Sequence, residues 1–276
     1  FLYNFFASYL RAVGNSVVPL WFLAVSAVLN IGLDLWFVIG LSRGVGGAAE
    51  ATVLSQYIAG VGIMVYAVLR CPELRAKEKF RLRRRSLREI ADYSVLTCVQ
   101  QSVMNLGILM VQGLVNSFGA PIMAAFAAAV KTDAFAYMPV QDFGNAFSTF
   151  TAQNYGAGEK ERLRKGLKDA LAASVLFSLA VSAVVVSFAR PLMGLFVDSA
   201  ETQIIAEGVR YLRIEGAFYF GIGILFLLYG LYRAVGRPGM SVVLTVLSLG
   251  TRVVLAYALS ALPALGVVGI WWSVPI

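Results

Sequence analysis

The sequence contains no histidine and only two cysteines, Cys71 and Cys98. Without histidine, imidazole general bases and Ser-His-Asp triads are excluded. Two isolated thiols also supply neither a disulfide framework nor a Cys/His metal site. No pair of carboxylates stands at a catalytic spacing. We therefore do not expect an enzyme, and we expect no cofactor and no transition-metal site.

Charged residues are also scarce, at 14% of the chain against about a quarter in a typical soluble protein, whereas 59% of the residues are hydrophobic. Apolar runs of about 18 or more residues indicate membrane-spanning helices. Seven complete runs are present, near 17–39, 48–69, 94–116, 121–150, 168–189, 212–232 and 240–262, with shorter ones at 1–10 and 266–276. These runs predict an all-α membrane protein, a polytopic helical bundle.

The net charge of +8 is distributed unevenly. Residues 70–92 hold nine Lys or Arg, and residues 155–168 hold five more. If the spans alternate in direction, both loops share one side with Arg11, Arg233 and Arg237. The positive-inside rule places that side in the cytoplasm. Basic loops there attract anionic lipid headgroups, so we expect membrane lipid rather than nucleic acid as the partner of these charges.

A repeat links the two ends of the chain. Arg11-Ala12-Val13-Gly14 returns as Arg233-Ala234-Val235-Gly236, 222 residues later, and at the same offset Gly44 falls on Gly266. Six complete spans lie between the two copies, so both halves have the same orientation. Weak internal symmetry between apolar segments is typical of secondary transporters. The pattern predicts two six-helix lobes in a parallel repeat (6+6).

The domain boundaries follow from this repeat and from the basic stretch. We expect residues 1–69 to form the end of the N-lobe, residues 70–92 the cytoplasmic linker and residues 93–276 the C-lobe. The chain begins with Phe1 and ends inside an apolar run. We therefore expect a fragment that runs from about the fourth helix to the start of the twelfth, with a truncated N-lobe.

Polar residues inside the spans are the first candidates for function, because each costs free energy in a membrane. Ser26, Asn30 and Asp34 recur at four-residue spacing, which places them on one face of a helix. Thr52 lies early in the next, antiparallel span, at a similar depth to Asp34. A carboxylate, an amide oxygen and a hydroxyl suit a hard cation or a proton. The alternative is that these residues only hydrogen-bond neighbouring helices.

A second polar stripe runs along the 121–150 span, where Asp133, Tyr137, Gln141 and Asn145 recur every four residues. A stripe of this length predicts a helix that lines water or substrate. Lys131 lies close to its outer end. In the alternative interpretation, Lys131 and Asp133 neutralise each other and Lys131 reaches the membrane surface.

Two further residues complete the predicted substrate cavity. Gln101 belongs to a group of amides in the 94–116 span, which either keep a pore polar or hold helices together. Arg252 falls opposite Asn30 at the repeat offset. An Arg at mid-depth needs an acceptor, and we expect Asp133, Glu215 or backbone carbonyls to supply it, in a structural pair rather than a substrate contact.

These residues sit in segments that resemble a known family. The segments are Arg11-Ala-Val-Gly-Asn-Ser-x-x-Pro19, Leu29-Asn30-Ile-Gly-Leu-Asp34, Gly44-Val-Gly-Gly-Ala-Ala-Glu-Ala-Thr52, Ala129-Val-Lys131-x-Asp133 and Ala152-Gln153-Asn154-Tyr-Gly-Ala-Gly158. Together they resemble multidrug and toxic compound extrusion (MATE) transporters, in a superfamily that also holds lipid-linked oligosaccharide flippases.

The resemblance implies efflux of amphipathic, cationic small molecules in exchange for Na⁺ or H⁺, by alternating access between two lobes. It assigns Asn30, Asp34 and Thr52 to the cation site of the N-lobe, and it implies a monomer in the bacterial inner membrane. Glu50 departs from the family, which has a small or apolar residue there. The alternatives are a lipid-linked oligosaccharide flippase, which needs a more cationic cavity than Lys131 and Arg252 provide, and a receptor or scaffold without transport.

Overall fold

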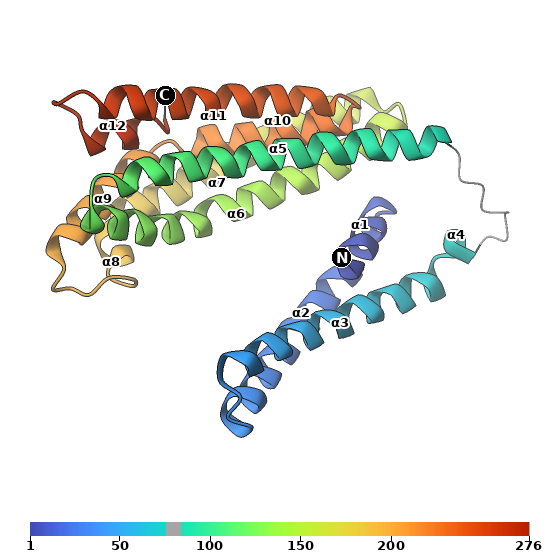
Figure 1. Ribbon diagram of the computed structural model, residues 1–276. Coiled ribbons are helices and arrows are strands. Elements are labelled where there is room, and N and C mark those ends of the chain that lie inside the picture. The colour runs from blue at the N-terminus through green and yellow to red at the C-terminus, as the bar shows by residue number, and fades with distance from the viewer. Residues whose placement is uncertain (76–83, 276) are drawn as a thin grey trace. The chain divides into compact units, whose positions relative to one another are not determined.

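The computed structural model describes residues 1–75 and 84–275, and the chain divides into two compact units, Phe1–Arg81 (unit 1) and Leu82–Ile276 (unit 2) (Figure 1). Every regular element of the described residues is a helix, which confirms the all-α fold class. Part of the expected linker, residues 76–83, lies outside the described residues. Residues 84–92, the C-terminal end of the expected linker, are helical.

Unit 1 contains α1 (Leu2–Ala12), α2 (Val17–Asp34), the π-helical segment η1 (Leu35–Gly40), α3 (Gly44–Arg70) and the short α4 (Pro72–Arg75). The long α3 contacts α1, α2 and η1. Its core is small and formed by Ala7 and Leu10 of α1 with Ile63 and Ala67 of α3. α2, which carries Asn30 and Asp34, packs along α3, which carries Thr52.

Unit 2 contains α5 (Arg84–Asn116), α6 (Ala120–Gly156), α7 (Lys160–Ser187), α8 (Ala189–Met193), α9 (Thr202–Gly216), α10 (Tyr219–Ala234), α11 (Pro238–Ser260) and α12 (Val267–Trp272). α10 packs on α6 and α7, and α11 packs on α5 (Figure 1). Its core includes an aromatic cluster in which the Trp271 ring stacks on Phe126, with 5.7 Å between centroids, and meets Tyr211 edge-on at 4.9 Å. This cluster holds α6, α9 and α12 together.

Five of the described helices are long and apolar enough to cross a membrane: α2 with η1, α3, α5, α7 and α11. A sixth span is possible if α9 and α10, which meet at a bend of 52°, count as one. The expected span at 212–232 covers the end of α9 and most of α10, with the break at Ala217 and Phe218 inside it. α6 is not among the five despite its 37 residues, because Lys131 and Asp133 lower its mean hydropathy.

The repeat is present in the backbone. Gly14 and Gly236 have φ of 89° and 78°, and each ends its helix with the same pair of hydrogen bonds. In the first copy Asn15 N donates to Leu10 O at 2.8 Å, and in the second Arg237 N donates to Tyr232 O at 2.9 Å. This is the Schellman arrangement that a glycine in the left-handed region permits. The two turns with this geometry stand 222 residues apart.

The two copies differ in one helix. In unit 1, α2 passes into the π-helical η1 after Asp34. The equivalent stretch of unit 2 stays α-helical to Ser260. Both copies nevertheless keep a close approach between a glycine and the preceding helix. A Cβ on Gly47 would meet Phe37, and a Cβ on Gly269 would meet Leu259, the residue equivalent to Phe37. π-helical turns are rare and are frequent at functional sites, so this difference directs attention to Asp34.

Candidate functional site

The predicted cation ligands of unit 1 lie where α2 meets α3. Asn30 stands one turn before Asp34 on α2, and Thr52 stands in the third turn of α3. The Asn30 amide Nδ2 donates a long hydrogen bond of 3.4 Å to Thr52 Oγ1, which itself donates to Ala48 O at 3.0 Å. The structure thus brings Asn30 and Thr52 together, and the amide of Asn30 retains its oxygen as an acceptor.

Asp34 is half-buried at the junction of α2 and η1. Its Oδ1 atom is buried and has no hydrogen-bond partner among the described residues. A buried carboxylate oxygen without a donor costs free energy unless a cation or a proton reaches it. Asp34 is therefore the group of this site that has an unmet need for positive charge.

Glu50, the other acid close by in sequence, is placed differently. Its side chain is half exposed and forms an ion pair with Arg43. A surface pair of this kind contributes little to stability, but it neutralises Glu50. Of these two acids, Asp34 is the one with a buried oxygen that lacks a partner among the described residues.

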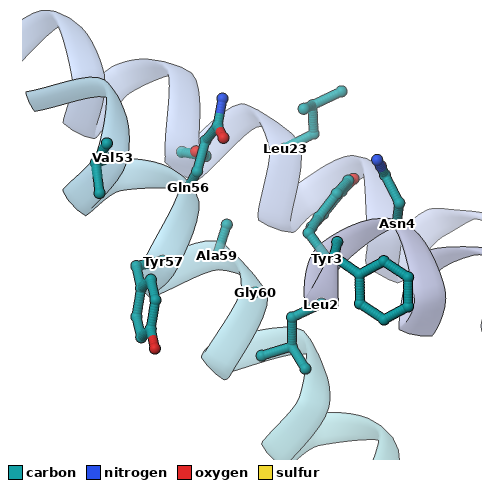
Figure 2. Close-up of a pocket in the computed structure, with 11 residues that line it drawn as sticks. Leu2, Tyr3, Asn4, Leu23, Val53, Gln56, Tyr57, Ala59 and Gly60 are labelled. Carbon is teal, nitrogen blue, oxygen red and sulfur yellow. The ribbon is translucent and has the colours of Figure 1, made fainter. Parts of the chain in front are cut away.

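A cavity of about 620 Å³ lies beside the candidate ligands (Figure 2). Tyr3 and Asn4 of α1, Leu23 of α2, and Gln56 and Gly60 of α3 contribute to its lining. Figure 2 shows Gln56 and Leu23 on the two long helices, with Tyr3 and Asn4 beside them on α1. Ser26 also lines it, four residues before Asn30, and Gln56 follows Thr52 by four residues. The cavity therefore lies one helical turn from the Asn30–Thr52 contact along both helices.

The equivalent positions in unit 2 lack this chemistry. At the repeat offset Asn30 corresponds to Arg252, Asp34 to Ala256 and Thr52 to Val274. Ala256 is fully buried in the core of unit 2. The shared packing of the repeat therefore does not require an acid, an amide and a hydroxyl, which weakens the interpretation that they only hold helices together.

The predicted cavity residues of α6 have different environments. Asp133 is 5% exposed, and the Tyr219 hydroxyl donates a hydrogen bond to its Oδ1. Lys131 is exposed and its Nζ lies 5.9 Å from the centroid of the Phe196 ring. No ion pair within 4.0 Å joins Lys131 to Asp133 in the described part of the chain. The interpretation in which the two neutralise each other directly was wrong.

The remaining predicted residues are spread over the surface and interior of unit 2. Tyr137 and Gln141 are half-buried, and Asn145 is exposed and accepts a hydrogen bond of 3.0 Å from Arg233 Nη2. Gln101 is exposed, whereas its neighbour Gln100 is buried. Spacing along the helix did not reveal which of the two amides faces the interior.

Arg252 does not form the direct ion pair expected for it. Among the described residues no carboxylate lies within 4.0 Å of Arg252, and its Nε is buried without a partner. Its charge nevertheless acts on both Asp133 and Glu215. Two cavities of unit 2, of about 500 and 320 Å³, are lined by none of the predicted cavity residues. The role of the predicted cavity residues in substrate binding therefore stays a prediction.

A family model described as MatE matches residues 95–258, more than half of the chain. The chain belongs to the MatE family. MatE proteins are transporters and not enzymes, in agreement with the sequence prediction.

Relatives match along nearly the whole chain. The probable multidrug resistance protein YpnP of Bacillus subtilis is 30% identical over 95% of this chain and 58% of its own length. The probable multidrug resistance protein NorM of Thermotoga maritima is 27% identical over 96% of this chain and 58% of its own length. This MatE chain thus spans less than two thirds of the relatives that it matches.

Solved structures agree with the fold. A crystal structure of a mutant of the Vibrio cholerae MATE transporter VcmN superposes with a TM-score of 0.91, at 22% identity, over 99% of this chain and 62% of that one. The likeness confirms a polytopic helical MatE fold.

Sequence reasoning underestimated two residues of this MatE chain. Glu215 entered the prediction only as an acceptor for Arg252, and Tyr219 did not enter it at all. Glu215 lies just before the break between α9 and α10, and Tyr219 lies just after it. A signal was available, because Glu215 is an acid at the start of an apolar run, where burial requires a partner or a proton.

Proposed function

We propose that this protein forms part of a cation-coupled efflux antiporter of the bacterial inner membrane, in which Asp34, Asn30 and Thr52 bind the coupling ion. The observation that carries the proposal is the buried, unpartnered Oδ1 of Asp34 at the junction of α2 and η1. The Asn30–Thr52 contact on the same pair of helices supplies two further oxygens.

Binding of a proton or Na⁺ at this site changes the charge held between α2 and α3 from negative to neutral. An ion shifts a conformational equilibrium only if it binds the two states with different affinity. The π-helical turn beside Asp34 offers such a difference, because its hydrogen-bond pattern is distinct from that of an α-helix. We infer that neutral and ionised Asp34 favour different geometries of this turn.

The exported compound is proposed to be an amphipathic, cationic small molecule. The support is the name of the relatives, which are described as probable multidrug resistance proteins. In this proposal Lys131, Asp133, Tyr137, Gln141 and Asn145 of α6, with Gln101 and Arg252, contribute to the substrate cavity, and the transporter acts as a monomer.

The test measures efflux of ethidium from inverted vesicles or cells that carry the intact protein, driven by a Na⁺ gradient or by a pH gradient. Asp34→Asn removes the ionisable group and keeps the shape of the side chain. We expect ion-driven efflux to fall by about 5- to 150-fold, the usual range of a coupling free energy between two sites. The gradient that drives wild-type efflux identifies the ion.

Glu50→Gln provides the matched control, because it also removes an acid from unit 1 but changes only a surface pair. We expect it to transport like the wild type. Undiminished ion-driven efflux in Asp34→Asn, at equal protein level, contradicts the assignment of Asp34 to coupling.

A further inference from the structure

A second group of buried ionisable residues lies in unit 2, away from the residues of the proposed function. Asp133 of α6 is 5% exposed and Glu215 of α9 is 7% exposed. Tyr219, the first residue of α10, donates its hydroxyl to Asp133 Oδ1. Arg252 of α11 acts on both carboxyls from beyond ion-pair distance. Residues of four helices thus contribute two acids, one phenol and one guanidinium.

Glu215 stands four residues before Tyr219, the hydrogen-bond partner of Asp133, and α9 packs on α6, so the two buried acids lie on packed helices. An ionised carboxylate has acceptors only, so two ionised groups cannot hydrogen-bond to each other. Consistent with this, Asp133 Oδ2 and Glu215 Oε2 are both buried and have no donor in the described residues. One proton placed between them satisfies both oxygens. Two carboxyls that share a site hold a proton for the same reason in other proteins.

Charge counting leads to the same state. With both acids ionised, the group that includes Arg252 carries a net charge of −1, and with one proton it is neutral. A buried net charge is costly in a low-dielectric interior, so the neutral arrangement is favoured. Other charges nearby do not replace the proton: Lys131 faces Phe196, Arg210 and Arg213 of α9 are exposed, and Glu207 is half-buried two turns away on α9.

The acids also bridge a break in the chain. α9 ends at Gly216 and α10 begins at Tyr219, with an angle of 52° between them. Glu215 lies just before this break and Tyr219 just after it, and both interact with Asp133 of α6. If both acids ionise, Glu215 and Asp133 repel each other while Tyr219 stays bound. The α9 side of the bend then loses this contact with α6, while the contact between Phe126 and Tyr211 remains.

Glu215 has access to a cavity of about 500 Å³, which Ser248, Thr251 and Ser273 also line. A cavity of this size holds water when polar groups line it, and water carries protons to and from a buried acid. A proton on Glu215 is therefore able to exchange with water in this cavity. Asp133 does not line the cavity, so its proton reaches water through Glu215.

We propose that Asp133 and Glu215 hold one exchangeable proton between them, and that this proton, together with the Tyr219 hydroxyl, latches the bend between α9 and α10. The site binds a proton, not a metal cation, and releases it through the cavity beside Glu215. This proposal is independent of the role of Asp34.

The first experiment detects the proton. Infrared spectra of the intact protein in lipid nanodiscs, with ¹³C-labelled Asp and Glu, distinguish a protonated carboxyl from a carboxylate by its C=O stretch. We expect a protonated-carboxyl band at neutral pH in the wild type that disappears in Asp133→Asn and in Glu215→Gln. In each variant the remaining acid faces an amide and Arg252, and it ionises. Glu207→Gln and Asp34→Asn are expected to keep the band.

The second experiment tests the latch by hydrogen exchange of the amides around Ala217 and Phe218, corrected for intrinsic exchange rates. In the wild type we expect protection to decrease at the pH at which the infrared band disappears. The amide of Glu215→Gln donates to Asp133 without an extra proton, so its protection is expected to be independent of pH. Tyr219→Phe removes the second contact and is expected to lower protection at all pH values.

Several results overturn the proposal. The shared proton is contradicted if the wild type shows no protonated-carboxyl band. It is also contradicted if the band survives in both Asp133→Asn and Glu215→Gln. Loss of the band on replacing choline by Na⁺ at constant pH makes the site a cation site instead. The proposed latch is contradicted if amide hydrogen exchange depends on pH in the same way in Glu215→Gln and in the wild type. If Asp133→Asn does not fold, Glu215→Gln and Tyr219→Phe decide the question. Failure of the Asp34→Asn efflux test affects none of these readings.

Discussion

The contact between α6 and α10 depends on two glycines, and adding one methyl group to it should be measurable. A Cβ on Gly230 would lie 2.5 Å from the backbone oxygen of Gly144, where ordinary contacts begin at 3.4 Å. A Cβ on Gly144 would likewise lie 2.8 Å from Phe226 O. Because the obstacle is backbone and not a flexible side chain, Gly230→Ala must push the two helices apart by several tenths of an ångström.

The expected cost has two parts. Overpacking of a close contact destabilises a protein by about 1–3 kcal/mol. Replacing a mid-helix glycine by alanine returns about 1 kcal/mol through helix propensity. Gly250→Ala on α11 isolates the second part, because nothing lies within 4 Å of its Cβ. We expect Gly230→Ala to be less stable than Gly250→Ala by about 1–3 kcal/mol, which corresponds to about 2–12 °C in apparent Tm for a unit of this size.

The assay is thermal denaturation of the detergent-solubilised protein, followed by intrinsic fluorescence at a fixed scan rate. Four tryptophans are present, and Trp271 in the core of unit 2 reports on its packing. Equal apparent Tm values for Gly230→Ala and Gly250→Ala would refute the reasoning, because they would show that the helices accept the added methyl group without strain.

Two further predictions concern single hydrogen bonds and backbone angles. Gln100 Nε2 donates to Thr245 Oγ1 at 3.1 Å inside unit 2, so Gln100→Leu should lower stability by about 0.6 kcal/mol, typical of such bonds between membrane helices, whereas Gln101→Leu should have no effect. Gly14 has open space around it but a φ of 89°, so Gly14→Ala should cost about 1–2 kcal/mol through backbone strain alone. Thermal denaturation checks both, and a neutral Gln100→Leu or Gly14→Ala would contradict the corresponding assignment.

The helices and the repeat followed from the sequence because their causes are local. Apolar runs mark the spans, and a glycine followed by a polar residue marks the helix ends, as at Gly14, Gly158 and Gly236, which all have positive φ. The assignment of the basic loops to one side of the membrane requires only a count of the Lys and Arg residues in each loop. Features of this kind do not require knowledge of which helix packs on which.

The rest depended on tertiary contacts. No proline marks the break after Gly216, and the apolar run continues across it, so periodicity alone gave no reason for two helices there. The partner of Asp133 is Tyr219, 86 residues away, and which amide of the pair Gln100 and Gln101 faces inward depends on the rotation of α5 against α11. Spacing along one helix does not contain that information.

The shared backbone of the two copies has a consequence for how such a protein can change. Equivalent glycines preserve the same turns in both halves, while Asn30, Asp34 and Thr52 have no chemical counterparts at Arg252, Ala256 and Val274. The turns therefore do not depend on which polar side chains stand at these positions, so the two copies are free to carry different chemistry.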